Sequence, residues 1–233
     1  MHLIQLPLDI TKAVRHLAQF MGPRALDDDS LVIKTALTEA LGGPVIRPWA
    51  IHARRGPVLT IVGYGDQSAE AVNARRALAL PSLQAAVGEA ISVEMPPLEP
   101  EKLYRFTVRL VPTIRVTPNG KRRHGERDAY LVAADEVGPG GALTRDSVYR
   151  DYLARKLIGA QLEACRLDGF RLARLMRPKS GGQATKTVPE AILSGVIRVS
   201  DEEALSQCIR SGVGRQRAYG YGMVRLQPAR LSD

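Results

Sequence analysis

The chain has 233 residues, of which 45% are hydrophobic and only 5% aromatic, so we expect an aliphatic core in one large or two small domains. It carries 33 Lys and Arg against 24 Asp and Glu, and its formal net charge of +9 favours an anionic partner. Charge alone does not separate nucleic acid from an acidic protein. No run of about 18 apolar residues predicts a membrane-spanning helix, and residues 1–6 lack the pattern of a signal peptide. We therefore expect a cytoplasmic protein with no membrane partner.

The first 95 residues predict the element order β-α-β-β-α-β, with an extra helix or a split first helix. Alternating apolar residues and flanking turn residues predict strands at 2–8, 45–55, 58–64 and 91–95. Capping residues and apolar periodicity predict helices at 9–20, 31–41 and 68–90, the last interrupted at Pro81. Residues 95–100 contain three prolines and are the best candidate for a linker.

Residues 101–233 predict the same order again. Strands are expected at 103–116, 170–177, 191–199 and 223–226, and helices at 147–167 and 201–210. A turn at 118–120 leads into a basic segment, and residues 179–186 form a polar hairpin tip. This order predicts an α+β fold of two tandem ferredoxin-like (RRM-like) domains, at residues 1–95 and 101–233.

The two cysteines, Cys165 and Cys208, both fall in expected helices. They are too few for a zinc site. We expect both to be reduced and buried, and we expect no bound metal.

The strongest local signal lies at residues 212–222, where four glycines surround two arginines and two tyrosines. Glycine permits positive φ, arginine binds phosphate with a planar fork, and tyrosine offers a face on which a base stacks. These properties predict a loop that grips an RNA backbone. A dinucleotide site would need a strand before the loop and a helix after it, which is the reverse of the order here. A plain glycine-rich turn would explain the glycines but not the arginines and tyrosines.

Basic residues gather in the same half of the chain. Arg105 and Arg109 are expected on one face of a strand because side chains alternate with a period of two. A solvated charged surface is the alternative explanation for such residues. The candidate RNA-binding residues are Arg105, Arg109, Arg115, Lys121, Arg122, Arg123, Lys179, Gly214, Arg215, Arg217, Tyr219, Gly220 and Gly222.

With these motifs the chain resembles the CRISPR RNA-processing endonucleases of the repeat-associated mysterious protein superfamily. Residues 212–222 look like the loop of the CasE branch, from type I-E systems, which reads approximately G-[IV]-G-R-x-[KR]-A-[FY]-G-x-G, and residues 103–123 look like its R-F-x-[VL]-R strand and G-K-R hairpin. The resemblance implies binding of the hairpin in a CRISPR repeat and cleavage at its base without metal or cofactor. The 2′-hydroxyl attacks the adjacent phosphodiester and leaves a cyclic phosphate. It also implies retention in an effector complex with other CRISPR subunits as partners.

One departure from the branch concerns the expected helix at 31–41. CasE-like proteins usually carry Tyr-x-x-His there, and this chain has Leu31 and Lys34 in the matching places. The imidazole that would make a good general base is therefore missing. In this respect the chain resembles the type IV CRISPR relatives of the branch.

Three residues are the candidates for the chemistry. Lys34 is a proton donor to the leaving oxygen, or a base if arginines depress its pKa; Arg24 clamps the phosphate; and His52 is the base. His16 is a weaker choice for the base. Lys34 can equally be a solvated lysine or a phosphate contact, and His52 can be structural. Accordingly, the alternative function is a non-catalytic subunit that binds the 3′ hairpin of the guide RNA. A backbone-type subunit is a third reading, which the arginine-rich terminal loop disfavours.

Overall fold

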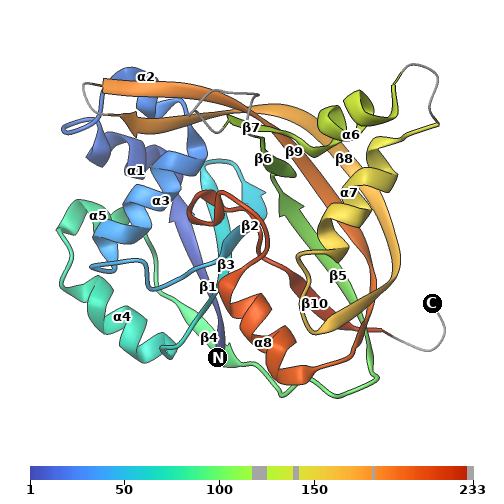
Figure 1. Ribbon diagram of the computed structural model, residues 1–233. Helices are drawn as coiled ribbons and strands as arrows, with labels where there is room; N and C mark the ends of the chain where they lie inside the picture. Colours follow the sequence, from blue (N-terminus) through green and yellow to red (C-terminus); the bar gives the residue numbers. More distant parts are fainter. Residues whose placement is uncertain (117–124, 139–141, 180–181, 230–233) are drawn as a thin grey trace.

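The computed structural model describes residues 1–116, 125–138, 142–179 and 182–229 of the chain (Figure 1). Within these ranges the fold consists of two four-stranded antiparallel sheets and a separate two-stranded one. Numbered in chain order within each sheet, the strands of both four-stranded sheets lie in the order 2-3-1-4. This confirms the predicted pair of tandem ferredoxin-like folds. None of the helices in the described ranges is long and apolar enough to cross a membrane.

The first half contains one sheet, in the order β2-β3-β1-β4, covered on one face by helices. Its elements are β1 (His2–Asp9), α1 (Ile10–Leu17), α2 (Pro23–Leu26), α3 (Asp29–Ala40), β2 (Trp49–Arg55), β3 (Val58–Gly65), α4 (Ala69–Ala77), α5 (Pro81–Ala86) and β4 (Ile91–Glu94). Alternation along β1 buries Ile4, Leu6 and Leu8 against α1, α3 and α5, which forms the first hydrophobic core. Asp28 begins α3 because its carboxylate accepts hydrogen bonds from the N–H groups of Ser30 and Leu31.

The second half contains the other large sheet, in the order β10-β5-β9-β8. Its elements are β5 (Leu103–Leu110), β6 (Thr113–Val116), β7 (Gly125–Asp128), α6 (Ala129–Val137), α7 (Arg145–Ala154), β8 (Ala160–Lys179), β9 (Gly182–Val199), α8 (Glu202–Ser211), the 3₁₀ turn η1 (Arg217–Tyr219) and β10 (Arg225–Pro228). Between β4 and β5 the chain forms no helix or strand, and we keep the proposed domain boundary there. Strands β8 and β9 form a long hairpin that reaches across to α2 and α3 of the first half (Figure 1).

Two of the predicted elements are wrong, helix α6 was not predicted, and β9 already begins at Gly182, inside the hairpin tip expected at 179–186. The strand expected at 103–116 breaks at Pro112, which has no N–H to donate to a ladder. Beyond this proline, β6 leaves the large sheet and pairs with β7 alone. The helix expected at 147–167 ends at Ala154, and the residues from Ala160 onward belong to β8.

The second error has a geometric cause. Register shifts between Leu162 and Ala164, and again between Leu167 and Gly169, change the phase of side-chain alternation along β8. The half-buried residues therefore do not keep the period of two that identifies a strand. As a result Cys165 lies on a strand, whereas Cys208 lies on α8 as expected, and both are free and half-buried rather than buried. Burial raises the pKa of the Cys165 thiol to about 11.

The two halves are joined by specific contacts. The hydroxyl of Tyr64 on β3 donates to the carbonyl of Val224 just before β10, at 2.8 Å. At the other end, the second carboxylate oxygen of Asp28 accepts from the N–H of Met176 on β8 at 2.6 Å. Asp28 is buried, so this bond fixes the start of α3 against the β8–β9 hairpin.

Candidate nucleic-acid interface

Residues 212–222, which we call the glycine loop, run from the end of α8 to just before β10. All four of their glycines have φ between +73° and +79°. A Cβ on Gly220 would lie 2.5 Å from the ring of Trp49, and one on Gly222 would lie 2.1 Å from the carbonyl oxygen of Val213. The N–H of Val213 donates to the carbonyl of Gly222 at 2.8 Å and closes the loop. Backbone conformation and packing therefore explain these glycines without a ligand.

The two arginines of the loop have protein partners. Arg217 donates to the carbonyl of Ser211, the last residue of α8, at 2.7 Å and so caps that helix. Arg215 forms an ion pair with Glu126 of β7 at 2.7 Å. The ring of Tyr219 lies under Lys34 of α3, with 5.2 Å from the Lys34 Nζ to the ring centroid.

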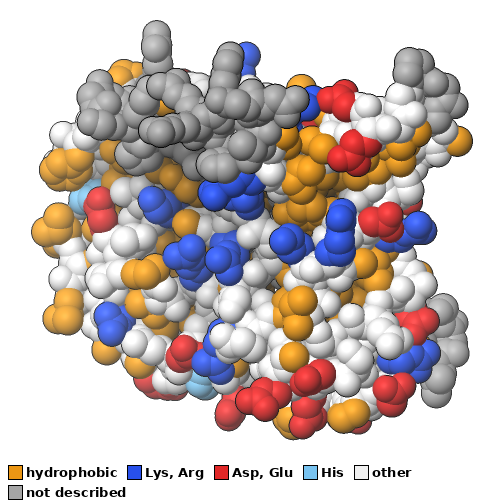
Figure 2. Space-filling model, in the orientation of Figure 1, with side chains coloured by type: hydrophobic (Ala, Val, Ile, Leu, Met, Phe, Trp, Pro, Cys, Tyr) orange, Lys and Arg blue, Asp and Glu red, His pale blue; other side chains and the backbone are white. Residues whose placement is uncertain are grey.

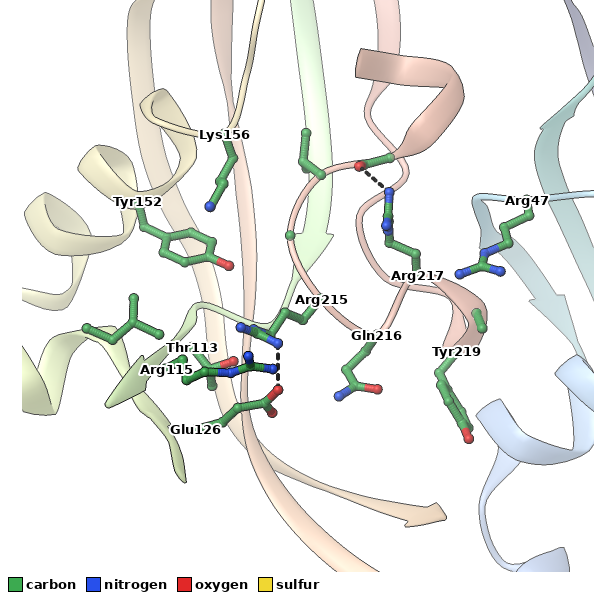
Figure 3. Close-up of a pocket in the computed structure, with 15 residues that line it drawn as sticks. Arg47, Thr113, Arg115, Glu126, Tyr152, Lys156, Arg215, Gln216, Arg217 and Tyr219 are labelled. Atoms are coloured by element: carbon green, nitrogen blue, oxygen red, sulfur yellow. Dashed lines mark hydrogen bonds and ion pairs between the residues drawn. The ribbon is translucent and has the colours of Figure 1, made fainter. Parts of the chain in front are cut away.

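Beside the glycine loop lies a pocket of about 840 Å³, which we call the loop pocket (Figure 3). Five cationic side chains and a single carboxylate are among the described residues that line it: Arg47, Arg115, Lys156, Arg215, Arg217 and Glu126. Within the described part of the chain, no hydrogen bond or ion pair engages the charged groups of Arg47, Arg115 and Lys156. Figure 2 shows Lys and Arg side chains gathered across the middle of this face. The pocket thus presents unneutralised positive charge to solvent, as a site for a polyanion would.

Helix α3 carries Lys34 to the glycine loop. Lys34 lines a cavity of about 230 Å³ that it shares with Arg47, Trp49 and Ala218. The indole N–H of Trp49 donates to the carbonyl of Ala218 at 3.3 Å, which holds the loop against β2. Leu31, one turn before Lys34, is buried against Met176 of β8. The helix position that carries tyrosine in the CasE branch is therefore part of a hydrophobic contact here.

A buried carboxylate fixes the other limb of the glycine loop. Glu190 of β9 accepts from Arg109 at 2.6 Å, from Arg171 at 2.7 Å and from the hydroxyl of Tyr221 at 2.7 Å. Burial by itself raises the pKa of Glu190, but these hydrogen bonds and the charge of Arg109 outweigh it and hold the pKa below its usual value. The N–H of Gly222 also donates to the carbonyl of Arg109 at 2.7 Å, so β5 and β9 together position the loop.

The structure brings some of the predicted site residues together. Around the glycine loop it gathers Lys34, Arg115, Gly214, Arg215, Arg217 and Tyr219. Gly220 and Gly222 belong to the loop but do not line the loop pocket.

Other predicted residues lie elsewhere. His52 is exposed on β2, and its Nδ1 lies 3.4 Å from a guanidinium nitrogen of Arg225. Together with Arg105 it lines a separate cavity of about 270 Å³ between the sheets. Arg109 shares a face of β5 with Arg105, as predicted, and is engaged by Glu190. His16 is buried between Ser82 and Glu39. Outside the described residues are the side chains of Arg24 and Lys179 and all of Lys121, Arg122 and Arg123.

Sequence reasoning missed several residues of the loop pocket, Glu126 among them. Arg47 lies in the connection between α3 and β2, Lys156 follows α7, and Tyr152 lies on α7. No motif marks any of them. Lys156 was further hidden by the mistaken extension of α7 to residue 167.

Comparison with known proteins supplies the class of this chain. The model of the CRISPR associated protein family matches residues 46–228, and the chain belongs to that family. No curated protein matches its sequence.

Several solved structures share the fold over nearly the whole chain. A CRISPR endoribonuclease Cse3 bound to 19-nt RNA is 19% identical, with a TM-score of 0.65 and coverage of 98% of this chain and 100% of the other. The CRISPR-associated protein Cas6e from Escherichia coli K-12 is 16% identical, with a TM-score of 0.63 and the same coverage. A chain of a CRISPR RNA-guided surveillance complex is 13% identical, with a TM-score of 0.62 and, again, coverage of 98% and 100%.

Proposed function

We propose that this protein binds the hairpin of CRISPR repeat RNA and cleaves it as an endoribonuclease. Membership of the CRISPR associated protein family and the shared fold of the RNA-bound Cse3 support the proposal. The observation that carries it is the placement of Lys34 against the glycine loop, next to a pocket lined by five cations. A phosphodiester at the edge of this pocket meets both positive charge and a proton donor.

The chemistry follows from the groups available there. The 2′-hydroxyl loses its proton to water as its oxygen attacks the adjacent phosphorus, the bond from phosphorus to the 5′-oxygen breaks, and a 2′,3′-cyclic phosphate remains. In our proposal Lys34 donates the proton to the departing 5′-oxygen, and Arg47, which shares its cavity, stabilises the charge on the phosphorane. Arg24, on the short helix before α3, remains our proposed phosphate clamp. We do not assign His52 to the same phosphate because it lines a different cavity.

The test is cleavage of a labelled repeat RNA in EDTA and in magnesium, with binding measured in parallel. We expect a cyclic-phosphate product in both buffers, slower cleavage by Lys34→Ala by about 10²-fold or more, and nearly unchanged binding. Lys12→Ala is the matched control, because Lys12 is an exposed helix lysine paired with Asp9 at 3.8 Å. A wild-type protein that binds the hairpin and leaves it intact in both buffers contradicts the nuclease assignment.

A second function is favoured by one observation. Leu31 is only 4% exposed and packs with Ala25 and Met176, so that position of α3 serves packing and not chemistry. The alternative is therefore a subunit that holds the 3′ hairpin of the guide RNA without cutting it. The same assay separates the two functions, since only this alternative combines tight binding with an intact RNA.

We also propose that the protein acts as a subunit of a CRISPR effector complex after processing. The shared fold of a chain from a CRISPR RNA-guided surveillance complex supports this proposal. Co-purification of the tagged protein with guide RNA and other CRISPR subunits is the expected result, and recovery of the protein alone opposes the proposal.

A further inference from the structure

One residue of the loop pocket has the opposite charge from its neighbours. Glu126 on β7 is the only carboxylate among the described residues that line the pocket. One of its oxygens accepts from Arg215 of the glycine loop at 2.7 Å, and the other is paired with the ammonium of Lys186 on β9. Glu126 thereby bridges two cations that come from separate elements (Figure 3 shows the pair with Arg215).

The arrangement has the shape of a phosphate contact. A carboxylate presents two oxygens to two cations, and a phosphodiester presents its two non-bridging oxygens in the same way. We propose that Glu126 holds the place of an RNA phosphate between Arg215 and Lys186, and that a bound hairpin displaces it. This inference rests on the proposed RNA-binding function.

Displacement of Glu126 from this bridge costs little free energy. The side chains of Arg215 and Lys186 are each 33% exposed and that of Glu126 is 18% exposed, so the bridge lies at the pocket wall and not in a core. Partly exposed ion pairs contribute little to stability. Moreover, among the described strands β7 pairs with β6 and with neither large sheet, so it can shift without breaking a ladder of either sheet.

The remaining charges of the pocket favour the incoming polyanion. Among the described residues, Arg47, Arg115 and Lys156 form no ion pair while Glu126 is bound to Arg215 and Lys186, so the pocket attracts RNA before the bridge opens. Only a ligand that engages these cations together compensates for the loss of the bridge. Glu126 is then a specificity determinant: it disfavours flexible RNA, whose phosphates are not held in place to engage these cations together, relative to a hairpin.

The experiment measures the affinity of a fluorescein-labelled RNA stem-loop, with a 2′-deoxynucleotide at the base of the stem to prevent cleavage, and of a single strand of the same composition. Glu126→Gln is expected to bind the stem-loop about threefold to fivefold more tightly than the wild type, which corresponds to the removal of a partly exposed pair. The gain is expected to be larger for the single strand. Glu126→Ala is also expected to bind RNA more tightly than the wild type. If Glu126 only held the loop in place, its removal would weaken binding instead.

Matched variants isolate the cause. Glu163→Gln also removes one negative charge and breaks an Arg–Glu pair, since Glu163 lies 2.7 Å from Arg198, but Glu163 is outside the loop pocket. This variant is expected to bind the stem-loop with an affinity within about twofold of that of the wild type. Adding Arg215→Ala to Glu126→Gln is expected to abolish the gain. The slope of affinity against salt is expected to be the same in Glu126→Gln as in the wild type, because both complexes contain the same phosphate contacts.

Two results would overturn the inference while leaving the proposed function intact. One is unchanged or weaker binding of the stem-loop by both Glu126 variants, with an unchanged melting temperature. The other is a salt slope steeper by about 0.9 in Glu126→Gln, which would mean that Arg215 stays paired with Glu126 in the wild-type complex. If the wild-type protein fails to bind the stem-loop even at low salt, the proposed function and this inference fall together.

Discussion

Replacing Gly220 by alanine tests whether packing against Trp49 shapes the glycine loop. The new Cβ would lie 2.5 Å from the nearest atom of the indole ring, and the backbone at this position has φ +79°. Alanine in the left-handed region costs about 1–2 kcal/mol. Inserting a methyl group against a rigid neighbour adds about 1–3 kcal/mol.

These contributions give a loss of about 3 kcal/mol in the free energy of unfolding. For a chain of this size that loss corresponds to a fall in melting temperature of roughly 6–12 °C. Differential scanning calorimetry at neutral pH measures it directly. We expect weaker RNA binding as well, because the loop would shift relative to Lys34 and the loop pocket.

Two control glycines separate the cost of a positive φ from the cost of the steric contact with Trp49. Gly214 has φ +73°, but its added Cβ would make only ordinary contact with the side chain of Tyr152, whose hydroxyl lies at 3.4 Å and Cε1 at 3.8 Å, so Gly214→Ala is expected to lower the melting temperature by only about 2–8 °C. Gly22 has no positive φ, and its added Cβ would have no described atom within 4 Å, so Gly22→Ala is expected to be neutral. If Gly220→Ala melts no lower than Gly214→Ala, the contact with Trp49 does not constrain the loop and the reasoning is refuted.

Three further predictions concern charge and hydrogen bonding. The pKa of Glu190 is lower in the folded chain than its ordinary value, so its contribution to stability is present above the unfolded pKa of about 4.3 and is lost as the pH falls through the folded pKa. Glu190→Gln is expected to be less stable than the wild type by about 2–4 kcal/mol at pH 7 and to lose less stability on acidification. If calorimetry shows an equally steep acid transition in the variant and the wild type, this prediction is wrong. Trp49→Phe removes the bond to the carbonyl of Ala218 and is expected to cost about 1 kcal/mol in urea unfolding, whereas no change in the midpoint would show that the bond is not needed. Combining Arg115→Ala with Lys156→Ala is expected to reduce the salt slope of hairpin binding by about 1.8 in anisotropy titrations, and an unchanged slope would place the phosphates elsewhere.

Much of the fold follows from local signals in the sequence. Asp201 caps α8, which begins where the sequence predicted a helix, and the two β-α-β-β-α-β orders were sufficient to predict the paired ferredoxin-like folds. The errors arose where the local pattern was altered by sheet geometry. Pro112 ended a strand that had looked continuous, and two bulges in β8 disguised its alternation.

The candidate site was less accessible from the sequence because it depends on contacts between distant segments. The motif at 212–222 located the glycine loop and the positive φ of its glycines, but not the packing of Gly220 against Trp49 or of Gly222 against Val213. Arg47 and Lys156 enter the loop pocket only because the two halves meet there, and a single charged residue in a connection carries no signal of that. His52 was grouped with Lys34 since both lie in the first half, yet they line different cavities.

The most direct test of the account is to map where the base of the RNA stem contacts the protein. A stem-loop carrying 4-thiouridine next to the scissile position would be crosslinked to the wild-type protein, and the crosslinked peptides identified by mass spectrometry. Crosslinks are expected at residues 34–47 and in the glycine loop. Crosslinks confined to β2 and β10 around His52 and Arg225, in the cavity between the sheets, would contradict the account.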